Sequence, residues 1–104
     1  MSFQVKISPR AKTEFEDQLL YLLERSPKGA EAWASEFNVT LASLEDRPEI
    51  HGLAPESDDH SIDIFQVIFK TKYGYPYRLL YSITEAEVLI HSVRGVGQNY
   101  TEIE

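Results

Sequence analysis

The spacing of apolar residues predicts a short strand and then two helices in the first half of the chain. Residues 3–7 alternate apolar and polar side chains, which is typical of a half-buried strand. Ser8-Pro9 and Ser26-Pro27 each place an N-cap residue before a proline, and both pairs indicate a helix start. We expect the first helix to run to about Arg25 and the second to end near Arg47, before Pro48. Their apolar stripes are Ala11, Phe15, Leu19, Leu22 and Leu23, and then Ala30, Trp33, Phe37, Leu41 and Leu44.

The second half of the chain predicts strands joined by short turns. Residues 48–61 contain two prolines and one glycine among polar side chains, so we expect a polar loop and the most mobile part of the chain. Residues rich in Ile, Val, Phe, Tyr and Leu follow and indicate three strands, the first of them apolar on both faces. These strands are expected at residues 62–70, 77–84 and 87–94, before a polar C-terminal tail at residues 95–104.

This order of elements predicts an α+β fold. The tight connection between the helices makes them an antiparallel hairpin. The β-α-α-β-β-β order then predicts a helical hairpin packed on one face of a mostly antiparallel four-stranded sheet. The 104 residues leave room for a single domain spanning 1–104.

The composition is that of an ordinary globular protein, with 42% hydrophobic and 26% charged residues. The absence of cysteine excludes disulfides, a thiolate zinc site and a cysteine nucleophile. No apolar run reaches the length of a bilayer span, and the start of the chain lacks the apolar region of a signal peptide. We therefore expect a cytoplasmic protein with no membrane partner.

The charge is acidic but unevenly distributed. The net charge is −7, which disfavours binding of the whole molecule to nucleic acid. Residues 1–60 carry six basic and twelve acidic side chains, whereas residues 61–104 carry four basic and five acidic ones. We expect any anion site in the second half, where the basic residues are Lys70, Lys72, Arg78 and Arg94.

Motifs for a cofactor or a metal are weak. Gly95-Val96-Gly97 lacks the surroundings of a phosphate-binding loop. Asp58-Asp59-His60 offers metal-ligand chemistry, but three polar neighbours in a loop are usually solvated. We expect neither a cofactor nor a bound metal.

Four residues are candidates for a functional site. Arg78 lies inside a predicted strand, where it either pairs with an acid or presents its guanidinium to a phosphate or carboxylate. His91 is either a hydrogen-bonded residue of the sheet or a general base. Arg94 stands at a strand end from which it can reach solvent, and Tyr100 lies in the tail.

Several segments together resemble a known family over almost the whole chain, from Val5 to about Tyr100. They are VKISPRAKTEFE, ERSPKGAEAWASEF, SLEDRPEIHGLAP, PYRLLYSI and VLIHSVRG. In this order and spacing they resemble the RelE/ParE superfamily of toxins from type II toxin–antitoxin systems, also called plasmid-stabilisation systems.

The resemblance implies a compact toxin that a cognate antitoxin neutralises in a hetero-oligomeric complex. One branch of the superfamily cuts mRNA in the ribosomal A site, and the other inhibits DNA gyrase. Arg78 matches the strand arginine of the nuclease branch. His91, Arg94 and Tyr100 lie where that branch has further basic, acid–base and stacking groups, so these four residues are the implied catalytic set of a nuclease.

Two departures favour the gyrase branch. Gln66 and Ile68 stand where RelE-like nucleases have lysines, and the acidic net charge opposes binding to the ribosome. The leading interpretation is therefore a ParE-like toxin. The alternatives are a RelE-like ribosome-dependent endoribonuclease and a degenerate, non-toxic binding member. The sequence allows two interpretations of four tyrosines, as core residues or as interface residues: Tyr73, Tyr75, Tyr77 and Tyr81. We favour the core for Tyr77 and Tyr81 and leave both interpretations open for Tyr73 and Tyr75.

Overall fold

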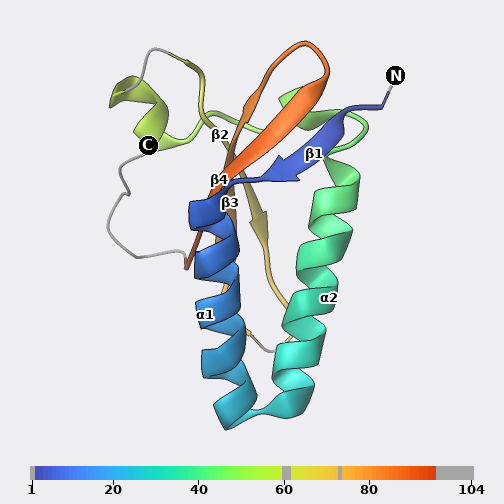
Figure 1. Ribbon diagram of the computed structural model, residues 1–104, viewed down its shortest axis with the longest axis vertical. Coiled ribbons are helices and arrows are strands. Elements are labelled where there is room, and N and C mark those ends of the chain that lie inside the picture. Colours follow the sequence, from blue (N-terminus) through green and yellow to red (C-terminus); the bar gives the residue numbers. More distant parts are fainter. Residues whose placement is uncertain (1, 60–61, 73, 96–104) are drawn as a thin grey trace.

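The computed structural model, which describes residues 2–59, 62–72 and 74–95, has the predicted order of strand, two helices and three strands (Figure 1). The strands and helices are β1 (Gln4–Ile7), α1 (Pro9–Arg25), α2 (Pro27–Ser43), β2 (Phe65–Phe69), β3 (Tyr77–Ile83) and β4 (Glu87–Gly95). Two short 3₁₀ turns, η1 (Pro48–Ile50) and η2 (Pro55–Asp59), lie between α2 and β2.

The four strands form one sheet in the order β1-β4-β3-β2. β2 and β4 are antiparallel to β3, whereas β1 runs parallel to β4, so the predicted mostly antiparallel sheet is confirmed. The register changes within the β3–β4 pair. Tyr81 is opposite Ile90 but Leu80 is opposite Ser92, which leaves His91 as the extra residue of a β-bulge.

Both predicted helix starts are confirmed. The Ser8 Oγ accepts a hydrogen bond from the Ala11 N–H, and the Ser26 Oγ accepts one from the Gly29 N–H, each at 3.1 Å. These bonds satisfy backbone donors that a helix start leaves without a partner.

The predicted end of the second helix is wrong. α2 ends at Ser43, four residues before Arg47. The Leu44 N–H bonds to the Leu41 carbonyl at 3.1 Å, so the last turn tightens to three residues. This tightening turns Leu44 into the core, where its side chain is fully buried.

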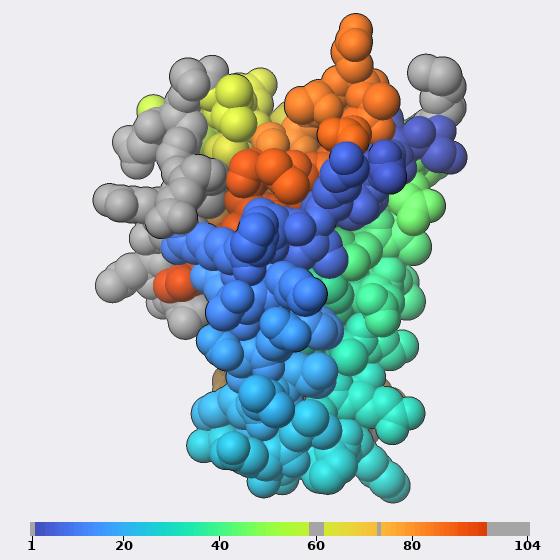
Figure 2. Space-filling view, in the orientation of Figure 1, coloured from blue at the N-terminus to red at the C-terminus, as the bar shows by residue number. Residues whose placement is uncertain are grey.

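The main core lies between the helical hairpin and one face of the sheet. Trp33 of α2 contacts four aromatic rings of this core and is stacked on Phe15 of α1, with ring centroids 5.1 Å apart. Figure 2 shows the two helices side by side over this face of the molecule. Aromatic rings therefore supply much of the apolar area that holds the helices on the sheet.

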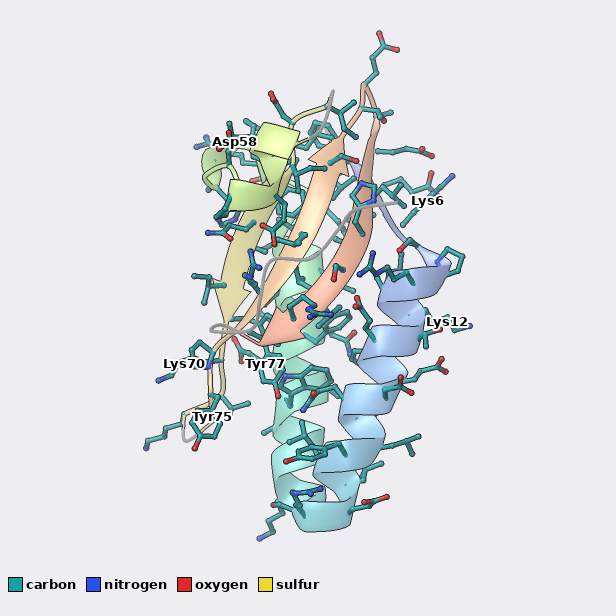
Figure 3. All side chains as sticks on the ribbon, turned by 90° about the vertical axis from the view of Figure 1, so that its left-hand side faces the viewer. Lys6, Lys12, Asp58, Lys70, Tyr75 and Tyr77 are labelled. Atoms are coloured by element: carbon teal, nitrogen blue, oxygen red, sulfur yellow. The ribbon has the colours of Figure 1, made fainter. Side chains whose placement is uncertain are left out.

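The other face of the sheet carries a cover that the sequence analysis did not predict. Residues 48–59, here called the covering segment, were expected to form a polar, mobile loop, but Pro48, Ala54 and Glu56 are buried. Ala54 packs with Ile64 and Leu80 in a second, smaller core. Figure 3 shows the covering segment, marked by Asp58, on the side of the sheet opposite the helices. Leu80 points to this outer face, so an apolar cover removes it from water.

The first of the three later strands also differs from its prediction. It spans Phe65–Phe69 instead of residues 62–70, and only one face is well buried. Val67 and Phe69 face the helices, whereas Ile68 is 55% exposed.

Tyr81 makes the stability of the fold sensitive to alkaline pH. Its ring is fully buried, and its hydroxyl donates a hydrogen bond to the Pro48 carbonyl at 2.7 Å. Burial first, and the nearby Glu49 second, raise the pKa of Tyr81 far above its usual value of 10.0. A raised pKa means that the folded state holds its proton more tightly than the unfolded state does, so stability falls once the pH passes about 10.

We expect Tyr81→Phe to remove part of this loss of stability at alkaline pH. Above pH 10, Tyr81 should contribute a slope of about 1.4 kcal/mol per pH unit to the free energy of unfolding, and the variant should lack that contribution. At pH 7 the variant should lose about 1 kcal/mol with its hydrogen bond. Urea denaturation from pH 7 to 11 measures both effects. If the free energy of unfolding fell equally steeply with pH in the wild type and in Tyr81→Phe, the assignment of the alkaline loss of stability to Tyr81 would be contradicted.

Candidate functional site

Arg78 is held in a buried ion pair on the outer face of β3. Its two terminal nitrogens contact the two carboxylate oxygens of Glu56, at 2.9 Å to Oε1 and 2.6 Å to Oε2. Its Nη1 also donates to the Oε1 of Gln66 on β2, at 3.2 Å. The side chains of Arg78 and Glu56 are only 7% and 2% exposed. Of the two sequence interpretations, the geometry therefore shows the one in which Arg78 pairs with an acid.

The strand register explains why this arginine needs a carboxylate. Arg78 of β3 lies directly opposite Arg94 of β4. Like charges in facing positions of a sheet repel each other. Glu56 neutralises the first arginine, and the covering segment brings this acid to the sheet because η2 places Glu56 over β3.

Arg94 is matched with a different acid, Glu14 of α1. The Arg94 Nη1 lies 3.4 Å from the Glu14 Oε2. The other carboxylate oxygen of Glu14 accepts hydrogen bonds from the Ser92 hydroxyl at 2.8 Å and from the Val93 N–H at 3.1 Å. Arg10, one turn earlier on α1, lies 3.6 Å from the Glu14 Oε2. Glu14 therefore joins α1 to the end of β4.

We expect Glu14→Ala to lower the free energy of unfolding by about 1–2 kcal/mol, because the Val93 N–H and the Ser92 hydroxyl lose their acceptor. Glu16→Ala is the matched control, since Glu16 is exposed on the same helix and carries the same charge. Chemical denaturation of both variants measures the difference. Equal stability of the two variants would show that Glu14 does not join the helix to the strand.

His91 and Ser82 form a polar pair further along the outer face. The Ser82 Oγ and the His91 Nε2 are 2.8 Å apart, and both residues are buried. The pair has the atoms of a nucleophile and a base, but neither side chain is open to solvent. His91 is thus a hydrogen-bonded residue of the sheet in this conformation.

The four candidate residues do not converge on one open site among the described residues. Arg78 contacts Glu56, Arg94 contacts Glu14, and His91 contacts Ser82. Tyr100 lies outside the described residues, as does His60 of the Asp58-Asp59-His60 sequence. Within residues 2–59, 62–72 and 74–95, no group of three His, Cys, Asp or Glu side chains could hold a metal ion. The assignment of a catalytic set therefore stays a hypothesis.

An apolar groove at the other end of the molecule has the features of a binding surface. It has a volume of about 530 Å³ and lies between the start of α2 and the connection from β2 to β3. We call it the hairpin groove. The residues that line it include Leu22, Ala32, Trp33, Tyr75, Tyr77 and two lysines, Lys28 and Lys72. Figure 3 shows Lys70 and Tyr75 at this end of the sheet, far from Asp58.

Aromatic side chains form the wall of the hairpin groove. Tyr77 meets the edge of the Trp33 ring, with centroids 5.3 Å apart, and burial raises the pKa of the Tyr77 hydroxyl, with a smaller contribution from Tyr21. The buried Nε1 of Trp33 has no hydrogen-bond partner among the described residues. Tyr75 is 86% exposed, and a large aromatic ring left in water is typical of a contact surface.

Comparison with known proteins places the sequence among toxins. Residues 5–100 match a family model described as "ParE toxin of type II toxin-antitoxin system, parDE". A solved structure described as "Chromosomal ParDE TA system from P. aeruginosa" has the same fold, with a TM-score of 0.68 at 11% identity. The match covers 91% of this chain and 97% of that chain. No curated protein matches the sequence. Among the described helices, none is both long and apolar enough to span a membrane.

Proposed function

The chain belongs to the ParE toxin family of type II toxin–antitoxin systems, and from this membership we propose that it inhibits DNA gyrase in the cytoplasm and is neutralised there by a cognate antitoxin. In this proposal it acts by binding its target, without cutting a nucleic acid. Toxin and antitoxin form a hetero-oligomer.

The pairing of Arg78 with Glu56 is the observation that carries the proposal. A nuclease needs cationic groups that can approach the phosphate whose bonds change, because negative charge builds up there in the transition state. Glu56 already occupies both terminal nitrogens of Arg78, and the pair is buried. This geometry supports a toxin that does not use Arg78 for catalysis.

The distribution of charge also supports a protein target. A chain of net charge −7 is repelled by the phosphates of the ribosome, because binding them requires a cationic surface that releases counterions. Two of the basic residues expected to form an anion site, Arg78 and Arg94, are matched with internal carboxylates. The remaining two, Lys70 and Lys72, lie at the β2–β3 connection, beside or in the hairpin groove.

The hairpin groove is the surface that we propose for the antitoxin. It combines an apolar floor, the exposed Tyr75 ring and two lysines in a protein that is otherwise acidic. Such a surface fits an amphipathic segment with apolar side chains on one face and acidic ones at its margin, since opposite charges steer the encounter.

Two assays with purified protein separate the proposed target from the ribosome. In a DNA supercoiling assay with bacterial gyrase, we expect the protein to inhibit the enzyme and the added antitoxin to restore it. In a bacterial cell-free translation reaction, we expect the mRNA to remain uncut.

Either of two other results would overturn the proposal. Cuts within codons of the translated mRNA would establish the RelE-like endoribonuclease. Normal supercoiling together with intact mRNA, from a protein that still binds its antitoxin, would identify a degenerate member that has kept the fold and lost its toxicity.

A further inference from the structure

Large apolar side chains are exposed together near the end of α1. Leu20 is 60% exposed, and Tyr21 and Leu23 are 49% and 44% exposed. Single exposed apolar residues are common on protein surfaces, but neighbouring ones are typical of a contact with another molecule. Leu20 and Leu23 are three positions apart, so they lie side by side on one face of the helix. Figure 2 shows the end of α1 at the front of the molecule, toward the bottom of the view.

Three carboxylates surround Leu20. Glu16, Asp17 and Glu24 stand four positions before, three before and four after it, and these positions are neighbours on the surface of a helix. All three side chains are exposed, and none of them forms an ion pair with another described residue. We call the following five residues the α1 face: Glu16, Asp17, Leu20, Leu23 and Glu24.

The basic residues of α1 leave this charge in place. Arg25 lies over the ring of Tyr21, with its guanidinium carbon 3.5 Å from the ring centroid. Arg10 contacts Glu14, with its Nε 3.6 Å from the Glu14 Oε2. Lys12 stands one turn before Glu16 but forms no ion pair with it. The α1 face therefore carries three negative charges and no positive one.

The α1 face points away from the hairpin groove. Leu22 lines the groove, and Leu20 lies two positions before it on the same helix. With 3.6 residues per turn, two positions separate the directions of the side chains by roughly 200°. The two surfaces therefore lie on opposite sides of one helix, which is about 10–12 Å across with its side chains. An antitoxin in the groove is close enough to exclude a bulky target from the α1 face.

The chemistry of the α1 face determines the kind of partner that it fits. Exposed leucines among carboxylates are complementary to an apolar depression among Lys and Arg side chains. An enzyme that binds DNA presents such cations, because it neutralises phosphates with them. We propose that the α1 face docks on a cationic surface of gyrase, with Leu20 as its apolar anchor. The inference rests on the proposed gyrase target and adds the surface that contacts it.

Leu20→Lys tests the anchor in the supercoiling assay with purified gyrase. The substitution removes the apolar side chain and adds a positive charge that the cations of the target repel. The toxin concentration that gives half-inhibition should therefore rise at least about tenfold. The helix should stay intact, because the new ammonium group lies one turn from both Glu16 and Glu24. Val39→Lys is the matched control, since Val39 is 59% exposed on α2, outside the α1 face and the groove residues.

A triple variant tests the charges. Glu16→Gln, Asp17→Asn and Glu24→Gln together should weaken binding to immobilised gyrase at low salt, and the Kd of this variant should depend less on salt than that of the wild type. The matched control converts two exposed glutamates and one exposed aspartate elsewhere to their amides: Glu45→Gln, Asp46→Asn and Glu49→Gln. Both variants have the same net charge, so a difference between them reports where the charges lie.

Antitoxin binding separates the two surfaces. Leu20→Lys should bind the antitoxin as the wild type does, because Leu20 lies outside the hairpin groove. This result would also show that the variant is folded. Ala32→Glu, in the groove, should do the opposite, since it should bind the antitoxin more weakly and inhibit gyrase as the wild type does.

Either of two results, from a wild-type protein that inhibits gyrase, would overturn this inference and leave the proposed function standing. One is equal inhibition by Leu20→Lys and Val39→Lys. The other is equal affinity of the two triple variants for gyrase. A wild-type protein that leaves supercoiling unaffected would overturn the proposed function together with the inference.

Discussion

Replacing Arg78 with alanine is expected to lower the free energy of unfolding by about 3–5 kcal/mol, because it leaves the buried Glu56 carboxylate without its cation. Glu56 is 2% exposed, so water cannot take over the role of the guanidinium. A domain of this size has a total stability of roughly 5–15 kcal/mol, so the loss is a large fraction of it. Guanidinium chloride denaturation at pH 7 measures the change.

Arg25→Ala is the matched control. Arg25 lies over the ring of Tyr21 on the exposed side of α1, with its guanidinium carbon 3.5 Å from the ring centroid. Its loss should cost no more than about 1 kcal/mol. If Arg78→Ala and Arg25→Ala were equally stable, the Arg78–Glu56 pair would have no part in holding the covering segment.

This expected instability changes how a toxicity test must be designed. A non-toxic Arg78→Ala variant would not identify a catalytic arginine, because unfolding alone would also abolish its toxicity. The double variant Arg78→Met with Glu56→Leu removes both charges and keeps apolar volume at the site. Replacing a buried ion pair with apolar side chains of similar volume often leaves stability unchanged or raises it by about 1–4 kcal/mol. We expect this double variant to fold and to inhibit gyrase as the wild type does.

The elements that the sequence predicted well are those determined by neighbouring residues. Ser8-Pro9 and Ser26-Pro27 set both helix starts because a cap, a fixed φ angle and the following apolar stripe are all local. The strands follow from short β-branched and aromatic runs. The end of α2 was missed because its cause is the burial of Leu44 in the core, which no local pattern specifies.

The candidate site was predicted less well because its partners are distant in sequence. Arg78 was correctly predicted to lie inside a strand, but its partner lies 22 positions earlier in a segment that the sequence predicts to be a polar loop. Glu14 looks like one of several solvated acids on α1, yet it binds residues 78 to 80 positions later. One available signal was the pair of arginines that an antiparallel β3–β4 register brings face to face, since facing cations require nearby acids.

The second large effect is expected at the hairpin groove. Ala32 is exposed on α2 and lines the groove, so Ala32→Glu adds both volume and a negative charge where we propose that an acidic, amphipathic segment of the antitoxin binds. Alanine and glutamate are both good helix formers, so α2 should remain intact. We expect the antitoxin to bind the variant about 2 kcal/mol or more weakly, which is roughly a 30-fold increase in Kd.

Trp33 provides the measurement, because it is the only tryptophan in the chain and lines the groove. Its fluorescence during titration with a tryptophan-free antitoxin segment should change on binding to the wild type. Asn38→Glu is the matched control, since it adds the same charge to an exposed position of α2 outside the groove residues. Because the two lysines attract an acidic partner, Lys28→Glu should weaken antitoxin binding. The difference in Kd between this variant and the wild type should shrink as the salt concentration is raised. Equal binding by Ala32→Glu and Asn38→Glu would move the antitoxin to another surface while leaving the gyrase proposal intact, since inhibition of supercoiling by the toxin is measured before the antitoxin is added.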